Sequence, residues 1–266
     1  MDLLIGTFVL RPYVFGFLAA FLVAGAVDLG IRRTLDFAAW VGPLAWLAEF
    51  SSTRIGIPFG LYHYTGTTRA QELFIADVPF MDCLSFTFLC YAAFCLARVA
   101  LAGRRVPAPT LALVAGVLMM LLDVVIDPLA VRGDRWFLGR IFFYPDGGVY
   151  FGVPLSNFAG WVVVGTLGVG GFMCWSGRRE AGFGRGWPAR EGRGSDTPDR
   201  LVRRGQPWPG VALYYAVFCF NLGVTAWIGE WMLVMVGTTV HLATALALWS
   251  VSQRPAEGLG LEKQQA

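Results

Sequence analysis

Long apolar stretches constrain the fold of this chain more than any other feature. A helix needs about 20 mostly apolar residues to cross the hydrocarbon core of a bilayer. Stretches of this kind lie near residues 12–31, 35–53, 76–99, 108–130, 152–175, 209–229 and 230–251. Hydrophobic residues make up 56% of the chain and charged residues only 15%, a balance that excludes a water-soluble domain of this size.

The sequence therefore predicts an all-α fold, a polytopic integral membrane helix bundle of about seven transmembrane helices. Only the Gly-Glu-Trp sequence around Glu230 separates the last two stretches, so a tight turn is expected there. Six spans, one of them a long broken helix, is the alternative.

Arginine is distributed unevenly between the loops on the two sides of the predicted bundle. One side collects Arg32, Arg33, Arg98, Arg104, Arg105, the arginine-rich segment 178–204, Arg254 and Lys263. The other side holds Arg11, Arg54, Arg69, Arg132, Arg135 and Arg140. Because cytoplasmic loops retain positive charge, we expect a multi-pass protein of the cell membrane with its N-terminus outside and its C-terminus in the cytoplasm.

Composition also divides the chain. Residues 1–175 are expected to form the first five helices and to hold the active site, and residues 209–252 the last two helices. Between them, the arginine-rich stretch 176–208 cannot bury a core and is expected to be a disordered linker. Residues 253–266 form a polar tail, and we expect no cleaved signal peptide at the N-terminus.

Several function classes are excluded by missing motifs. The net charge of +3 is small and its arginines mark topology, so we expect no nucleic-acid binding. The cysteines form no CxxC or Cys/His pattern, and His63 and His241 lack metal-binding spacing, so no metal is expected. No Walker loop or dinucleotide fingerprint indicates a cofactor. The only lysine, Lys263, lies in the tail, which excludes a retinal Schiff base.

Acidic side chains within or beside the spans require an explanation, because they are costly in a membrane. Those expected toward the same, outer face are Glu49, Asp77, Asp82, Asp123, Asp127 and Glu230. Asp28 belongs to the opposite end of its helix. We expect it to form a local ion pair with Arg32, one turn on, and to be structural.

Asp123 and Asp127 are the strongest candidates for chemistry. Their spacing of four places both side chains on one helix face, one turn apart. Two carboxyl groups in a poorly hydrated place do not both ionise easily, so at least one is expected to hold a proton at neutral pH, as an acid catalyst must. The alternative is that Asp127 and Pro128 merely end the helix. Glu49 lies deeper than an interfacial residue needs to lie, which favours a functional role there too.

The segment "GIPFGLYHYTG", residues 56–66, is unusual for a connecting loop. Its glycines and Pro58 allow the chain to fold back between helices. Phe59, Tyr62 and Tyr64 are then expected to line the mouth of a site where an apolar substrate meets water. The alternative for these residues is an aromatic belt at the membrane interface.

Two further segments complete a pattern with this loop. They are "LDVVIDPLAVRGDRW" at 122–136 and "YPDGGVYFGVPLSNFAGW" at 144–161. Together with "WLAEFSSTRIGIPFGLYHYTG" at 46–66, they resemble the CruF-type carotenoid 1′,2′-hydratases of the carotenoid biosynthesis membrane protein family. The resemblance covers residues 40–165 well and the rest mainly by hydropathy, and its specificity comes from three motifs in the same order.

The resemblance implies addition of water to the terminal double bond of an acyclic carotenoid, without redox chemistry or a cofactor. We expect Asp127, with Asp123 beside it, to be the acid, and Glu49 to be the base that orients water. Asn157 is expected to orient the water as well, with helix-to-helix hydrogen bonding as its alternative. The expected substrate-binding residues are Phe59, Tyr62, Tyr64, Tyr150 and Asn157.

Two other functions remain open at this stage. A membrane lycopene cyclase also protonates a terminal double bond, and a small proton-coupled transporter would use buried acids as relays. The expected partners are the lipophilic carotenoid and the lipid bilayer. Association with other enzymes of the carotenoid pathway, such as a glycosyltransferase that acts on the new hydroxyl, is left open by the sequence.

Overall fold

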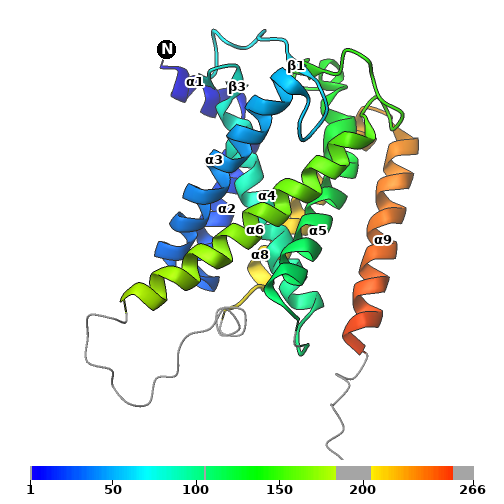
Figure 1. Ribbon diagram of the computed structural model, residues 1–266. Coiled ribbons are helices and arrows are strands. Elements are labelled where there is room, and N and C mark those ends of the chain that lie inside the picture. Colours follow the sequence, from blue (N-terminus) through cyan, green and yellow to red (C-terminus); the bar gives the residue numbers. More distant parts are fainter. Residues whose placement is uncertain (1, 105, 184–204, 254–266) are drawn as a thin grey trace, which may run out of the picture.

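The computed structural model describes residues 2–104, 106–183 and 205–253. The helices are α1 (Leu3–Leu10), α2 (Pro12–Asp28), α3 (Ile31–Ile55), α4 (Phe80–Ala100), α5 (Ala108–Ala130), α6 (Leu155–Phe183), α8 (Trp208–Trp227) and α9 (Trp231–Gln253), with a 3-10 turn η1 (Gly133–Arg135). The strands are β1 (His63–Tyr64), β2 (Phe74–Ile75), β3 (Val78–Pro79) and β4 (Phe142–Phe143). The long helices form one bundle, which confirms the all-α prediction (Figure 1).

Each of the apolar stretches contains a helix, but the count of seven spans is not confirmed. In the described part of the chain, five helices are long and apolar enough to cross a membrane: α4, α5, α6, α8 and α9. A sixth span results if α1 and α2, which meet at an angle of 91°, are counted together. Helix α3 is long, with 25 residues, but it carries charged residues near both of its ends.

Proline and glycine set several helix boundaries. Pro12 begins α2, where its missing N–H costs nothing because the first turn has no partner for it. Gly56 ends α3 in the left-handed conformation, with φ at 74°, which a side chain would disfavour. The chain therefore leaves α3 sharply and turns back over the bundle.

Helix α4 forms the centre of the bundle and is buried on most of its surface. It packs against α2, α3, α5 and α8. Beside it, α5 and α6 approach closely, since a Cβ atom on Gly165 would lie 2.8 Å from the Cα atom of Gly116. In lipid, burial of apolar surface drives little association between helices. Small residues instead let the helix backbones approach closely, and the resulting packing holds the helices together.

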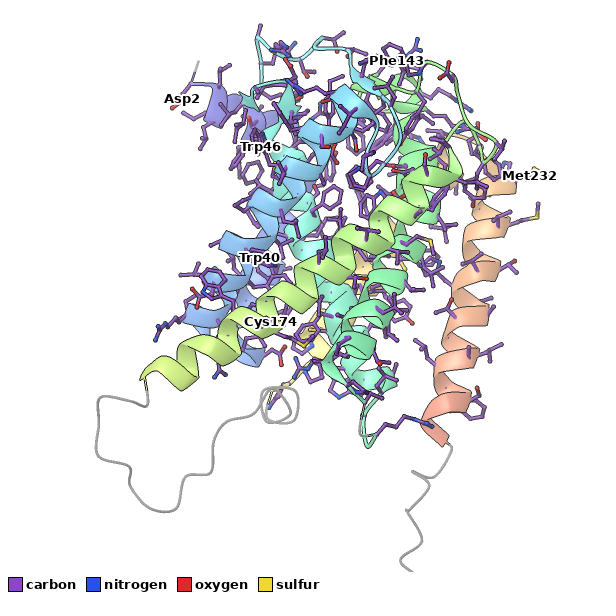
Figure 2. All side chains as sticks on the ribbon, in the orientation of Figure 1. Asp2, Trp40, Trp46, Phe143, Cys174 and Met232 are labelled. Carbon is purple, nitrogen blue, oxygen red and sulfur yellow. The ribbon has the colours of Figure 1, made fainter. Side chains whose placement is uncertain are left out.

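The outer surface is apolar, as a bilayer requires. Helix α9 exposes Met232, Leu242, Leu246 and Trp249, each at 60% or more of its surface. Met232 points away from the bundle near one end of the helix (Figure 2). Soluble proteins rarely expose apolar side chains along a whole helix, so this face is explained by contact with lipid.

Asp28 does not pair as the sequence predicted. Its Oδ2 atom accepts hydrogen bonds from Arg98 Nη1 at 2.6 Å and from the Tyr91 hydroxyl at 3.1 Å, both on α4. The expected ion pair with Arg32 is therefore wrong. Sequence proximity suggested Arg32, whereas the buried face of α2 turns Asp28 into the bundle. Its role is still structural, because it ties α2 to α4.

Helix α6 continues to Phe183, and α8 begins at Trp208. Residues 176–183 are thus helical, so the prediction of a linker from residue 176 is wrong for this part of the stretch. Its central residues 184–204 and the tail from 254 onward lie outside the described residues.

The arginine distribution makes a prediction about topology. A reporter fused after residue 190 is expected to be cytoplasmic, and one inserted near residue 140 external, because positive loops stay inside. The activity of a reporter that works on only one side of the membrane, measured in intact cells, tests both positions. The reverse pattern of reporter activity would contradict the proposed orientation.

Candidate active site

A cavity of about 130 Å³ lies at one end of the bundle. Its walls come from α2, α3, α4, α5, α6 and α8 and from the loops that follow α3 and α5. This end, called the site end below, contains the C-terminal parts of α3 and α5 and the N-terminal parts of α4 and α6. The acidic residues predicted to share one face do gather here.

The loop at 56–66 is held over this cavity by three sets of contacts. Strand β1 pairs antiparallel with β4, so that Tyr64 lies opposite Phe142. The backbone N–H of Phe59 donates to the Ser52 hydroxyl at 3.0 Å. A Cβ atom on Gly160 would lie 2.6 Å from the Phe59 ring and 2.8 Å from the Pro58 carbonyl oxygen. The loop thus packs directly on α6, which explains why these two separated sequence motifs occur together.

Glu49 is buried in the wall of the cavity. The Tyr64 hydroxyl donates to its Oε2 atom at 2.7 Å, and the Tyr62 hydroxyl contacts the same oxygen. All three residues line the cavity, as the sequence predicted. Phe59, the fourth residue predicted from this part of the chain, lines it too.

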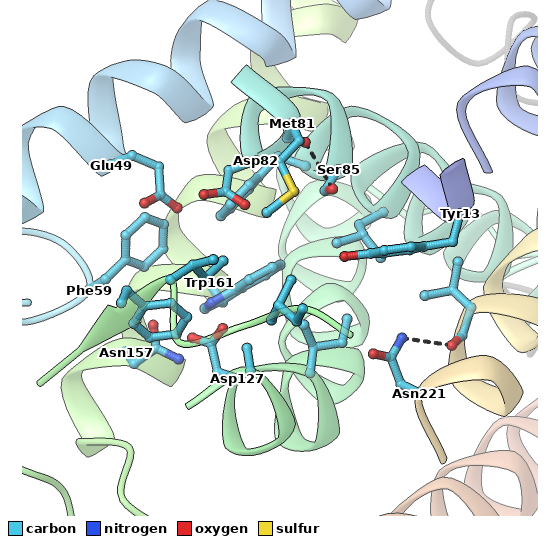
Figure 3. A pocket seen from close by; sticks show the side chains of 18 of the residues that line it. Tyr13, Glu49, Phe59, Met81, Asp82, Ser85, Asp127, Asn157, Trp161 and Asn221 are labelled. Atoms are coloured by element: carbon cyan, nitrogen blue, oxygen red, sulfur yellow. Dashed lines mark hydrogen bonds between the residues drawn. The ribbon is translucent and has the colours of Figure 1, made fainter. Parts of the chain in front are cut away.

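Asp123 and Asp127 lie at different depths. Asp127 lines the cavity, where Figure 3 shows it beside Asn157 and Trp161. Asp123 is fully buried behind it and accepts a hydrogen bond from the Asn157 amide at 2.6 Å. Its second oxygen, Oδ1, has no partner among the described residues. Asn157 lines the cavity beside Asp127 and donates to Asp123, so it lies between the acid that faces the cavity and the acid behind it.

Tyr150 does not join this group. Its hydroxyl donates to the Val124 carbonyl oxygen at 3.2 Å, and its ring packs against Phe151 and Phe158. It is absent from the lining of the cavity. The geometry gives no support to the expected role of Tyr150 in substrate binding and places it as a brace between α5 and the start of α6.

Asp82 also lines the cavity. The sequence did not predict it as a residue of the site. Its Oδ2 atom lies 2.7 Å from the Tyr64 hydroxyl. The signal in the sequence was a carboxylate only three residues into the most deeply buried helix of the bundle. The sequence marks Asp82 as an unusual acid, but it does not show that Asp82 contacts Tyr64 in the loop before α4.

Two other acids at the site end are accounted for by arginines. Asp77 forms ion pairs with Arg69 and Arg54, and the hydrogen bond from Arg69 is the main reason that its pKa lies below the usual value. Glu230 contacts Arg135 and lies 3.2 Å from Arg132. Burial acts to raise the pKa of Glu230, but these two arginines outweigh it and lower the pKa. Both acids have structural roles on the surface.

The acids in and directly behind the cavity differ from these two. Within the described residues, Glu49, Asp82, Asp123 and Asp127 form no ion pair with arginine or lysine. Buried carboxylates without counter-ions are costly, and several of them together cannot all carry charge. A cluster of this kind holds protons, which is what acid–base chemistry on an apolar substrate requires.

Aromatic rings form the rest of the wall. Phe86 and Trp161 stack with ring centroids 4.4 Å apart, and Phe59 lies 5.7 Å from Phe86. Toward α2 and α8 the lining becomes apolar, and Tyr13 stacks on Phe220 at 5.2 Å. Figure 3 shows Tyr13 and Asn221 at the side of the cavity away from Glu49 and Asp82. The cavity therefore has an acidic end and an aromatic, apolar end.

Neither histidine belongs to the cavity. His241 lies inside α9, where Nδ1 is 3.0 Å from the Gly237 carbonyl oxygen and the ring stacks on Phe218. His241 therefore has a helix-packing role between α9 and α8. His63 is exposed, and its ring lies 6.0 Å from that of Phe143. Within the described residues, no group of three or more His, Cys, Asp or Glu side chains is placed to hold a metal.

Comparison with known proteins agrees with the sequence motifs. A family model described as "Carotenoid biosynthesis protein" matches residues 4–244. The chain is also similar to the bisanhydrobacterioruberin hydratase of Haloarcula japonica, with 31% identity over 234 residues that cover 86% of this chain and 70% of that protein. No solved structure matches the chain. With nearly its whole length matched, the chain belongs to the carotenoid biosynthesis protein family.

Proposed function

We propose that this protein is a carotenoid hydratase that adds water to the terminal 1′,2′ double bond of an acyclic carotenoid and so forms a tertiary alcohol. The observation that carries the proposal is the cavity, in which an aromatic, apolar wall ends at carboxyl groups that form no ion pair with any described arginine. The similarity to a protein named as a hydratase supports the same reaction class.

Hydration begins with a proton transferred to the less substituted carbon of the double bond. Asp127 is the proposed acid, because it is the member of the Asp123/Asp127 pair that faces the cavity. Asp123 lies behind it as a second buried carboxyl group, and two such groups so close together do not both ionise easily. The product of this step is a tertiary cation, and the acid must be neutral before the step and ionised after it.

Water then captures the cation. Glu49 is the proposed base that orients this water and accepts its proton, with Tyr62, Tyr64 and Asn157 as further polar contacts. The π-faces of Phe59, Phe86 and Trp161 line the cavity and stabilise a cation that has no hydrogen-bonding groups of its own. The rest of the polyene extends along the apolar side formed by α2 and α8.

Product analysis tests this function. When the chain is expressed in cells that make lycopene, we expect a product heavier by one water, with an unchanged absorption spectrum because the conjugated system is untouched. A product of unchanged mass with an altered spectrum would indicate a cyclase instead. If correctly inserted protein converts neither lycopene nor other acyclic carotenoids, the result counts against the hydratase and the cyclase. It would favour a proton-coupled transporter. Cells that express the Glu49→Gln variant provide the matched control.

A further inference from the structure

The Tyr64 hydroxyl lies between two carboxyl groups. Its oxygen is 2.7 Å from Glu49 Oε2 and 2.7 Å from Asp82 Oδ2. Figure 3 shows the two carboxyl groups turned toward one another at the acidic end of the cavity. Because β1 pairs with β4, the position of Tyr64 between them is fixed by the backbone.

The number of protons in this arrangement follows from the contacts. Each oxygen–oxygen contact at this distance is a hydrogen bond and needs one proton. A phenol carries a single proton and an ionised carboxylate carries none. The one proton of Tyr64 serves one of its two contacts, so a carboxyl group must supply the other. Of Glu49 and Asp82, at least one therefore carries a proton.

The contacts also indicate where that proton lies. An ionised Glu49 accepts hydrogen bonds from both Tyr62 and Tyr64, whereas an ionised Asp82 would accept one from Tyr64 alone. Hydrogen bonds to a charged acceptor are the stronger ones, so the charge is better placed on Glu49. Asp82 is then the neutral acid and donates to the Tyr64 oxygen. Burial, and next the negative charge held by the Glu49–Asp82 pair, raises the pKa of Tyr64, so that the phenol stays protonated.

We propose that Asp82 stores the exchangeable proton of the active site and that Tyr64 transfers it between Asp82 and Glu49. The relay rests on the proposed hydration reaction. It supplies the step that returns a proton to Asp127 after each turnover. Asp82 acts through Tyr64 and Asp127, and thus as a relay residue that transfers no proton to the substrate itself.

The proton balance of one cycle closes without any further reactant. Asp127 gives its proton to the alkene, water adds to the cation, and Glu49 takes the proton that the water loses. Asp82 then gives its proton to the ionised Asp127, which lines the same cavity. Tyr64 donates its proton to Asp82 and receives one from Glu49. Each group ends with the proton count that it had at the start, and the net reaction is alkene plus water to alcohol.

The Asp82→Asn variant tests the relay, because it separates the first turnover from later ones. The Asn amide still donates to the Tyr64 oxygen, so Glu49 keeps its hydrogen bonds. With enzyme in excess, we expect single-turnover product formation within about tenfold of the unmodified protein. With substrate in excess, steady-state turnover is expected to fall by about a hundredfold or more, the range typical for a lost proton-transfer group. Asp134→Asn, a change of an exposed aspartate, is the matched control.

A second measurement needs no substrate. Infrared difference spectra of the purified protein at neutral pH, unmodified minus Asp82→Asn, are expected to show the carbonyl stretch of a protonated carboxylic acid. The Asp134→Asn difference spectrum is expected to lack it. If the protein forms no hydrated carotenoid but this band is present, the hydratase proposal fails and the shared proton stands.

Three results would overturn the relay. The first is an infrared difference without the acid band. The second is steady-state turnover of Asp82→Asn close to that of the unmodified protein. The third is an equal loss in single and multiple turnovers, which indicates that Asp82 matters for shape rather than for proton return.

Discussion

Asp127→Asn is expected to lower the rate of carotenoid hydration about a hundred- to ten-thousand-fold, which is the usual contribution of a general acid. Asn keeps the shape of the side chain beside Asn157 and Trp161 but has no acidic proton to give. The rate is measured as hydrated product formed in isolated membranes, divided by the amount of inserted protein. Glu49→Gln is expected to cause a loss of similar size, because it removes the base.

Asp134→Asn again provides a control that leaves the cavity untouched, and it is expected to retain activity. The companion variant Asp123→Asn distinguishes the two members of the pair. A hydration rate near normal in both Asp123→Asn and Asp127→Asn would place the acid elsewhere, and Asp82 or Glu49 would then be the next candidate.

Glu72→Gln is expected to have the largest effect on stability. Glu72 and Arg11 form an ion pair at 2.9 Å in which both side chains are fully buried, and Arg11 also donates to the Leu138 carbonyl oxygen at 2.7 Å. Removing one partner leaves a buried charge without compensation, which typically costs about 3–5 kcal/mol in the free energy of unfolding. The measurement is the thermal unfolding midpoint in detergent micelles, followed by tryptophan fluorescence.

Glu230→Gln is the matched control for this variant. Glu230 pairs with Arg135 and Arg132 at a partly exposed position, where loss of an ion pair costs about 1 kcal/mol or less. A double variant in which Arg11 and Glu72 are both replaced by methionine is expected to regain part of the loss, because no unpaired charge remains. An unchanged midpoint in Glu72→Gln would show that the pair contributes nothing to stability.

The sequence by itself determined the helices, because apolar length and the proline and glycine positions act locally. It also determined that four acids, Glu49, Asp82, Asp123 and Asp127, lie toward one end of the bundle. Successive membrane helices run in opposite directions, so the position of a residue along its helix gives the end at which it lies. The one-turn spacing of Asp123 and Asp127 needed no structure. The three motifs that indicate the carotenoid biosynthesis protein family were also visible in the chain alone.

Sequence could not determine the rotation of each helix about its axis or the partner on the next element. Asp28 therefore pairs with Arg98, 70 positions away, rather than with Arg32. For the same reason Asp127 faces the cavity while Asp123 lies behind it, and Tyr150 turns away to Val124.

The contact of Tyr64 with both Glu49 and Asp82 depends most fully on tertiary structure. It requires α3, α4 and the β1–β4 pairing to be in place together. No local pattern specifies such a contact, because its energy is realised only after distant segments have packed. The sequence determined which groups are available for chemistry, and the packing of the bundle decided which of them share a proton.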